Sequence, residues 1–552
     1  MTVTEAVAPA EPAPTPSGSN RDNAVHGWPR LLALLIRRDR IRILIWAVAI
    51  GALVIVSASS IENLYSTPEQ LATYSALAVD NAAIIIQAGP GYGLDEPTQG
   101  AVLMNELSLW TLMGVALMSI FMVTRHTRAE EENNTAELLR ATPLGRYAAP
   151  VAAMVGVALT NVLVSIIVAA GLVLMGYAAA GSIAFGCALS ACGLVFAALT
   201  LVTGQIASSA RAATGLAVAV LGISFVLRAV GDVGNGLLSW LSPLHWSQAI
   251  QAFVNNDWWV LAIPLVATVG LTWLTTVLAA HRDFGSGMLP DRAGRPAAPR
   301  SLSGAYGLAL RLQRAAMFAW VTGVTLLGVF YGVITDEAEQ MVVDNPELEE
   351  FFAQAGVGSI TDSFLATAAL MIGLLATGYA VSGVLKLRTE ETAGRAEPLL
   401  ATPTSRTRWA TSHLCVAAGG LLMVLIGGGF GLGLGAGIVT DDSSRVAQMI
   451  GSCLAVAPAV AVVAAVAFLL CCALPKWALL AWAAMAFVVV VGLLGAVLNL
   501  PQWVMDVSPF AHIPPAPAAP VTAGPLIVLM AISVALVALG LFLLDRRDMH
   551  SS

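Results

Sequence analysis

Residues 128–146 read RAEEENNTAELLRATPLGR, and residues 388–406 read RTEETAGRAEPLLATPTSR. The two stretches align without gaps, and 10 of their 19 positions are identical. Further matches keep the same order along the chain. Arg37, Arg40 and Trp46 correspond to Arg311, Arg314 and Trp320, and residues 87–89 correspond to residues 354–356. Near the end of each half, Ser242 and Pro243 correspond to Ser508 and Pro509, and Arg282 and Asp283 correspond to Arg547 and Asp548. The chain is therefore a tandem duplication, and each half is expected to repeat one fold.

The composition places the chain in a membrane. Of its 552 residues, 57% are hydrophobic and 11% are charged, and the mean hydropathy of +0.80 is too high for a soluble globular protein. Residues 1–27 are rich in Ala, Pro, Ser and Thr, unlike a secretory signal peptide, and are expected to form a disordered cytoplasmic tail. All six cysteines lie in apolar runs, so no disulfide framework is indicated.

Twelve apolar stretches are long enough to cross the hydrocarbon core as helices. They are residues 43–60, 104–124, 149–175, 183–203, 212–227, 259–280, 315–334, 364–385, 411–438, 449–470, 478–498 and 525–544. If the N-terminus is cytoplasmic and every stretch crosses, 25 of the 27 Lys and Arg residues fall on the inner side, as the positive-inside rule requires. We therefore expect an all-α polytopic membrane protein of two fused six-helix repeats, with both termini in the cytoplasm.

The duplication also sets the expected domain boundaries. The first six-helix repeat covers residues 28–283, a Gly-, Pro- and Arg-rich cytoplasmic linker covers 284–303, and the second repeat covers 304–552. A short amphipathic stretch precedes the first span of each half, at residues 29–40 and 306–314. Each stretch would either lie along the inner leaflet or extend the spanning helix into the cytosol.

The duplicated motif lies on the cytoplasmic side, between the second and third spans of each half. We expect a short helix there, because Thr127 and Glu130 suit a capping box and Pro143 and Pro403 follow where each helix would end. No His or Cys accompanies the glutamates, so the motif does not indicate a metal or a catalytic site. A solvated charged loop is the simpler alternative, but two ungapped copies at equivalent positions favour a shared contact.

The pattern Arg-x-Glu-Glu…Ala-Glu-x-Leu-x-Ala-Thr-Pro-x-x-Arg resembles the coupling-helix motif of ABC-2 type permeases, also called type V ABC transporters. The duplicated twelve-span form is similar to actinobacterial exporters of polyketide antibiotics, the tetronasin type, and to mycobacterial multidrug efflux permeases. The resemblance implies that two copies of a separate ATPase subunit dock on these helices. The implied contact residues are Glu130, Glu131, Glu137, Leu139, Glu390, Glu391, Glu397 and Leu399.

The two copies of the motif are not identical. Gly394 and Arg395 replace Asn134 and Thr135, and Pro398 stands where the first half has a leucine, so the two docking sites need not be equivalent.

The chain is not expected to hydrolyse ATP by itself. It has only two lysines, Lys386 followed by Leu387 and Lys476 followed by Trp477, so neither can belong to a Walker A motif. ATP and Mg²⁺ would then bind to the partner subunit. We expect this chain to bind no cofactor, metal or nucleic acid, and its partners to be the ATPase, membrane lipids and cargo.

By the same resemblance, the second and fifth spans of each half line a central path for the cargo. The candidate lining residues are large and apolar or aromatic, as a hydrophobic cargo would require, although ordinary packing is an alternative for each. They are Trp110, Met113, Met118, Phe225, Met371, Tyr379, Trp482 and Met485.

A few polar residues fall near the outer surface. We expect Glu106 and Arg228 to reach that surface by snorkelling, and His245 and His512 to be solvated or interfacial, because no ligand partner follows either histidine at a regular spacing.

The function indicated is an ATP-driven exporter of hydrophobic small molecules, such as antibiotics or drugs, in the bacterial plasma membrane. A lipid or glycolipid exporter would have the same architecture. An ion-coupled secondary carrier would need an ionisable group inside a span, and no predicted span has a central Asp, Glu, Lys or Arg.

Overall fold

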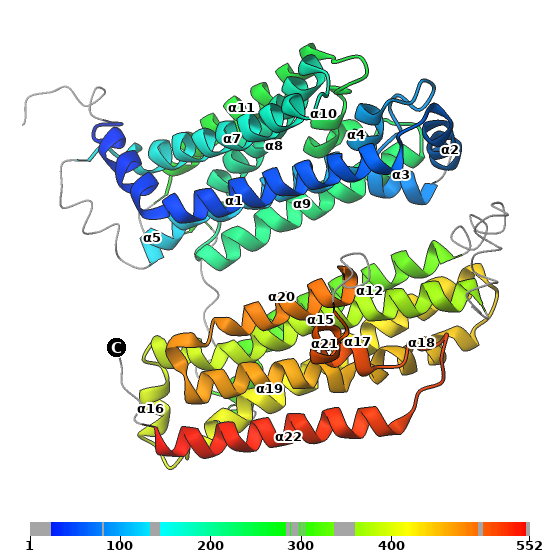
Figure 1. Ribbon diagram of the computed structural model, residues 1–552. Coiled ribbons are helices and arrows are strands. Elements are labelled where there is room, and N and C mark those ends of the chain that lie inside the picture. The colour runs from blue at the N-terminus through cyan, green and yellow to red at the C-terminus, as the bar shows by residue number, and fades with distance from the viewer. Residues whose placement is uncertain are drawn as a thin grey trace, which may run out of the picture. The chain divides into compact units, whose positions relative to one another are not determined.

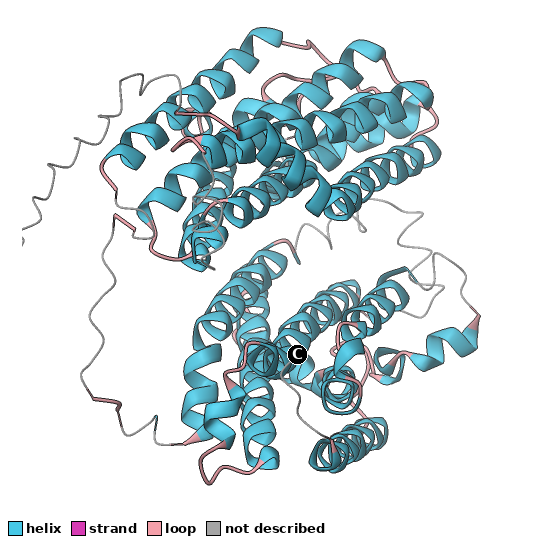
Figure 2. Ribbon diagram, turned by 90° about the vertical axis from the view of Figure 1, so that its left-hand side faces the viewer, coloured by secondary structure: helices cyan, strands magenta, loops and turns pink. Residues whose placement is uncertain are grey.

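The computed structural model describes residues 24–79, 82–132, 144–282, 287–288, 297–299, 302, 304–335, 359–494 and 501–547. These residues form α-helices and short 3-10 helices and contain no strand, as Figures 1 and 2 show. The chain divides into two compact units, Met1–Ala293 and Gly294–Ser552. The boundary between them lies inside the stretch 284–303 that was predicted as a linker.

The described part of the first unit contains six long helices and several short ones. The long helices are α1 (Trp28–Leu64), α4 (Gln99–His126), α7 (Ala148–Leu174), α8 (Ala179–Ile206), α9 (Ala210–Val233) and α11 (Ala262–Ala280). The short ones are α2 (Pro68–Ala78), α3 (Ala82–Ala88), α5 (Arg128–Glu132), α10 (Pro243–Gln248), η1 (Ser239–Leu241) and η2 (Trp258–Leu261).

The second unit repeats this order with differences in length. Its longer helices are α12 (Ala305–Val333), α15 (Ile360–Thr392), α17 (Arg406–Val439), α18 (Ser444–Ala455), α19 (Ala457–Ala473), α20 (Leu480–Leu494) and α22 (Ala523–Arg546). The short ones are α16 (Ala396–Leu400), α21 (Gln502–Val507), η4 (Pro475–Trp477) and η5 (Pro509–His512).

Every predicted span falls on a helix. Eleven helical segments within the described residues are long and apolar enough to cross a membrane, and α18 and α19 together make one of them. The predicted span 478–498 falls on α20, which has 15 described residues and is shorter than the others. The chain is therefore an all-α, multi-pass membrane protein.

Equivalent helices form the centre of each unit. In the first unit α4 and α8 are the most deeply buried spans, and α1, α7, α9 and α11 pack around them. In the second unit α15 and the α18–α19 pair are the most buried, whereas α12 and α22 are largely exposed. Lipid tails are as apolar as leucine, so the units are held together mainly by close packing of these helices rather than by removal of apolar surface from water.

The closest packing joins α12 to α17. A Cβ atom added to Gly431 would lie 2.1 Å from the carbonyl oxygen of Thr325, and one added to Gly435 would lie 2.5 Å from the carbonyl oxygen of Val329. Only glycine lets two helix backbones approach this closely. The corresponding helices of the first unit are packed less tightly, because a Cβ on Gly51 would meet only the side chain of Ile167.

The first helix of each unit includes the predicted amphipathic stretch. α1 is one uninterrupted helix from Trp28 to Leu64, and Figure 1 shows its first turns, in the darkest blue, bent away from the rest. α12 likewise runs without a break from Ala305. Each amphipathic stretch is therefore continuous with the spanning helix that follows it.

Candidate functional site

The first copy of the duplicated motif begins at the C-terminal end of the second span. Glu130 and Glu131 lie on α5, and a single residue separates α5 from the end of α4. An Nη atom of Arg38, on α1, lies 2.8 Å from Glu130. Glu131 is held by two arginines, Arg128 at 2.6 Å and Arg282 at 2.5 Å. Glu137 and Leu139 fall outside the described residues.

The second copy begins inside the spanning helix. We predicted one separate short helix for it, but α15 continues to Thr392, so Glu390 and Glu391 lie on its last turn. The chain then turns at Gly394, whose φ of 68° is a conformation that glycine adopts without strain, and α16 follows. The replacement of Asn134 and Thr135 by Gly394 and Arg395 therefore coincides with this turn.

Glu390 and Glu391 also have intramolecular partners. Glu390 is buried and lies 2.7 Å from Nε of Arg395 and 3.2 Å from Nζ of Lys386. Glu391 pairs with Arg388 at 3.0 Å and, through its other oxygen, with Arg547.

The same three-point contact recurs in both units. Arg282 follows the last span of the first unit, and besides Glu131 it donates a 3.0 Å hydrogen bond to the carbonyl oxygen of Gly204, near the end of α8. Arg547 follows the last span of the second unit, and besides Glu391 it donates a 3.0 Å hydrogen bond to the carbonyl oxygen of Cys471, near the end of α19.

We call each contact the arginine clamp. It suits the negative end of the helix dipole, where a cation is favoured. It also connects the motif to the C-terminal ends of the fourth and sixth spans of its unit. Sequence reasoning missed this role, although the match of Arg282 with Arg547 in the repeat was the signal for it.

The four docking candidates of the second motif differ in exposure, with Glu390 buried and Glu391 half-buried. Glu397 and Pro398, on α16, are exposed, whereas Leu399 is half-buried and packs against the hydrophobic core of its unit. Of the residues that the resemblance assigns to ATPase docking in this unit, Glu397 is therefore the most accessible.

A buried carboxylate that sequence reasoning did not single out lies behind the first motif. Asp39 of α1 is buried, and Nε2 of His126 lies 2.6 Å from it. Arg42 and Arg125 each lie 3.3 Å from its other oxygen. In the repeat alignment these positions carry Gln313 and Lys386 in place of Asp39 and His126. The two units thus stabilise equivalent regions with different charges.

The candidate path residues differ in their surroundings. Met118 and Tyr379 are fully buried in the cores of their units. Met113, Phe225, Met371 and Met485 are half-buried, and Trp110 and Trp482 are exposed. The two tryptophans are therefore the members of this set most available to a cargo in this conformation.

Two apolar grooves lie between equivalent helices. One of about 600 Å³ is lined by α7, α8 and α11, and one of about 440 Å³ is lined by α15, α17, α19 and α22. Both volumes fall within the ~300–1,000 Å³ typical of sites for drug-sized ligands.

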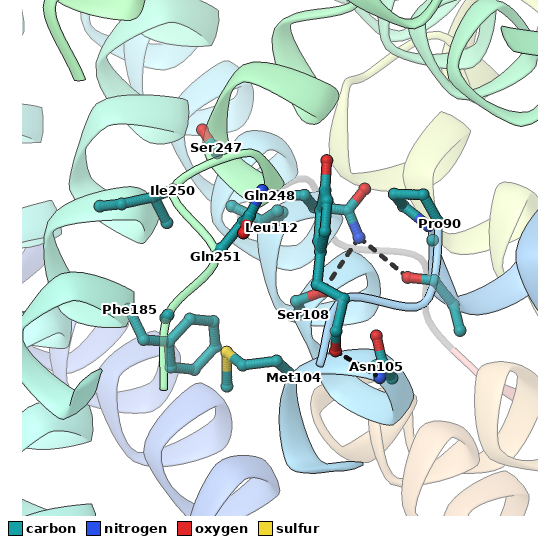
Figure 3. A pocket seen from close by; sticks show the side chains of 14 residues that line it. Pro90, Met104, Asn105, Ser108, Leu112, Phe185, Ser247, Gln248, Ile250 and Gln251 are labelled. Atoms are coloured by element: carbon teal, nitrogen blue, oxygen red, sulfur yellow. Dashed lines mark hydrogen bonds between the residues drawn. The ribbon is translucent and has the colours of Figure 1, made fainter. Parts of the chain in front are cut away.

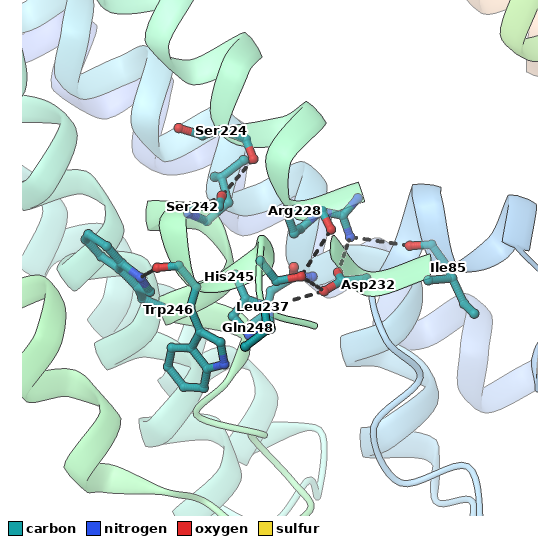
Figure 4. Close-up of polar contacts among 12 residues, drawn as sticks. Ile85, Ser224, Arg228, Asp232, Leu237, Ser242, His245, Trp246 and Gln248 are labelled. Atoms are coloured by element: carbon teal, nitrogen blue, oxygen red, sulfur yellow. Dashed lines mark hydrogen bonds and ion pairs between the residues drawn. The ribbon is translucent and has the colours of Figure 1, made fainter. Parts of the chain in front are cut away.

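A polar cluster lies at the end of the first unit that is opposite the motif (Figure 4). We expected Arg228 to snorkel to the surface, but it is fully buried, pairs with Asp232 at 3.4 Å and donates hydrogen bonds to the carbonyl oxygens of Ile85 and Ile86. His245, expected to be solvated or interfacial, is buried with Nδ1 3.4 Å from Asp232. Both expectations failed because they overlooked Asp232, which stands four residues after Arg228 and can pair with it on a helix.

Next to this cluster is a cavity of about 20 Å³, shown in Figure 3. The side-chain nitrogen of Gln248 donates 2.9 Å hydrogen bonds across it, to the carbonyl oxygen of Ala88 and to Oγ of Ser108. The volume suits one water molecule and is far too small for a drug-sized cargo.

The chain is similar over nearly its whole length to a known permease. Over 535 residues it is 36% identical to the multidrug efflux system permease protein Rv1217c of Mycobacterium tuberculosis (strain ATCC 25618 / H37Rv). The aligned region covers 96% of this chain and 97% of the relative. The family model of the C-terminal domain of that permease matches residues 302–544.

Proposed function

Because this chain belongs to the family of ABC-type multidrug efflux permeases, we propose that it is the membrane subunit of an ATP-driven exporter of hydrophobic small molecules. The observation that carries the proposal is the similarity across 96% of the chain to a multidrug efflux permease. The two apolar grooves, each large enough for a drug-sized molecule, support a hydrophobic cargo.

The energy would come from two copies of a separate ATPase subunit, which bind ATP and Mg²⁺ and dock on the duplicated motifs. The position of both motifs at the ends of the most buried spans supports this role, because a force applied there reaches the centre of each unit. Exposed Glu397 would contact the ATPase directly. Glu131 and Glu391 would act indirectly, by fixing the motif through the arginine clamp. The motifs and both termini would then lie in the cytoplasm.

The experiment is transport in proteoliposomes that contain this chain and the proposed ABC ATPase subunit. We expect uptake of a hydrophobic dye such as Hoechst 33342 into inside-out vesicles only when ATP and both subunits are present. Dye transport driven by a proton or sodium gradient, without the ATPase, would instead identify a secondary carrier. ATP-dependent movement of a fluorescent phospholipid, with no movement of dye, would identify a lipid exporter.

A charge reversal tests the docking site. Glu397→Arg should reduce both copurification of the ATPase and dye transport, because it changes an exposed charge in the motif. Glu69→Arg is the matched control, since Glu69 is an exposed carboxylate on α2, in a loop assigned to the opposite side of the membrane. Equal copurification of the ATPase with both variants would contradict the docking role of Glu397.

A further inference from the structure

The first helix of each unit carries an exposed stripe in which one arginine stands between two large apolar residues. On α1 the stripe is Ile36, Arg40 and Leu44, and on α12 it is Leu310, Arg314 and Phe318. Members of each stripe are four residues apart, so they lie on one face of the helix. The positions correspond one to one in the duplication, so the same surface occurs in both units.

The arginine of each stripe is distinguished by its apolar flanks. Arg38 and Arg42 of α1 pair with Glu130 and Asp39. Among the residues that the structure describes, no carboxylate lies within ion-pair distance of Arg40 or Arg314. Within the described residues Arg37 and Arg311, one turn earlier, also have no ion-pair partner, but only the stripe arginines have a large exposed apolar residue both four positions before and four positions after them. Each guanidinium is exposed on a surface whose other members are apolar, with Leu44 62% and Phe318 72% exposed.

An apolar stripe with a single cation fits the boundary between lipid headgroups and acyl chains. Leu44 and Phe318 belong to the spanning parts of their helices and would contact acyl chains. One turn earlier, the long side chain of arginine can extend along the apolar surface and place its charge at headgroup level. A planar guanidinium there can bind two phosphate oxygens at once.

We propose that Arg40 and Arg314 each bind the phosphate of an anionic phospholipid in the inner leaflet, with Leu44 and Phe318 set among its acyl chains. The assignment to the inner leaflet rests on the orientation given under the proposed function. A basic residue near an anionic surface gives an attraction that corresponds to about a fivefold preference.

The test measures lipid association directly and requires neither ATP nor cargo, so its outcome is independent of whether the chain exports drugs. The full-length chain is placed in phosphatidylcholine bilayers with spin-labelled phosphatidylglycerol or spin-labelled phosphatidylcholine, and the motionally restricted fraction of each label is compared. We expect about a fivefold preference of the wild type for phosphatidylglycerol. Arg40→Gln combined with Arg314→Gln should reduce that preference to nearly none.

The control removes the same charge elsewhere. Arg211 and Arg408 are exposed near the starts of α9 and α17, but the residues four positions before and after them are small or polar. Arg211→Gln combined with Arg408→Gln should keep the preference. Equal loss in both double variants would mean that overall charge is responsible and would overturn the proposal, as would full retention in the Arg40 and Arg314 variant.

Excess inorganic phosphate distinguishes the two sources of a phosphate group. The lipid preference should survive it, because the apolar flanks contribute nothing to a free anion. Complete loss of the preference in phosphate would show a site for soluble anions and would also overturn the proposal.

Discussion

The glycines between α12 and α17 allow a sharp test of how the second unit is held together. Gly431→Ala would place a methyl group 2.1 Å from the carbonyl oxygen of Thr325, whereas an ordinary contact begins at 3.4 Å. The obstacle is backbone and cannot rotate away, so the helices must separate locally by about 1.3 Å. Dispersion contacts lose a quarter to a half of their depth over a gap of about 0.5–1 Å, so much of this interface would be weakened.

We expect Gly431→Ala to lower the free energy of unfolding by about 2–3 kcal/mol, the upper part of the range of about 1–3 kcal/mol that is usual for overpacking, because the obstacle is backbone. For a unit of this size that corresponds to a Tm lower by about 4–12 °C. A thiol-reactive dye measures the transition in detergent, because Cys453, Cys471 and Cys472 are buried in the folded second unit and become reactive on unfolding.

Gly419→Ala is the matched control on the same helix, since nothing lies within 4 Å of a Cβ at that position. It should leave Tm unchanged or slightly raise it, because alanine favours the helix. Gly51→Ala should be milder than Gly431→Ala, because its obstacle is the movable side chain of Ile167. Equal Tm values for Gly431→Ala and Gly419→Ala would refute the close-contact argument.

Three further outcomes are expected. Arg547→Glu should abolish ATP-driven transport while the chain still inserts and purifies, and adding Glu391→Arg should restore part of it, because the clamp contact is re-formed with the charges exchanged. Asp232→Asn should lower the free energy of unfolding by about 3–5 kcal/mol, because it leaves the buried charge of Arg228 unpaired; the same dye measures this through Cys192, which is buried in the first unit. Burial, helped by the charges of Asp232 and Asp257, raises the pKa of Tyr92 to about 12. Because an unfolded tyrosine loses its proton near pH 10, the free energy of unfolding should fall as the pH rises from about 10 to 12, and Tyr92→Phe should lessen that fall. The same alkaline profile in the wild type and in Tyr92→Phe would contradict this role of Tyr92.

Much of the fold followed from the sequence because its signals are strong and local. A membrane span needs a long apolar run, and all twelve predicted runs fall on helices. The duplication then fixed which helices correspond. The ends of helices were less predictable: α15 continues through Glu390 and Glu391, because nothing before Gly394 interrupts the helical pattern.

The contacts of the motif could not be predicted in the same way. The clamp joins residues 151 positions apart in the first unit and 156 apart in the second, and a list of charges does not say which of them meet. Asp39 was hidden for a related reason, since it stands among arginines on an amphipathic stretch and looks solvated until α4 is packed against it. Arg228 is different: its partner Asp232 was visible at helical spacing.

The unequal charges behind the two motifs have a consequence for how such a chain can change over time. In an assembly of two identical six-span chains, replacing a buried aspartate alters two sites at once, and both must tolerate it. Fusion of the copies into one polypeptide removes that constraint, so Gln313 and Lys386 can occupy one half while Asp39 and His126 remain in the other. Each half can then acquire a specialised task, but two copies of the same half can no longer replace the two different halves.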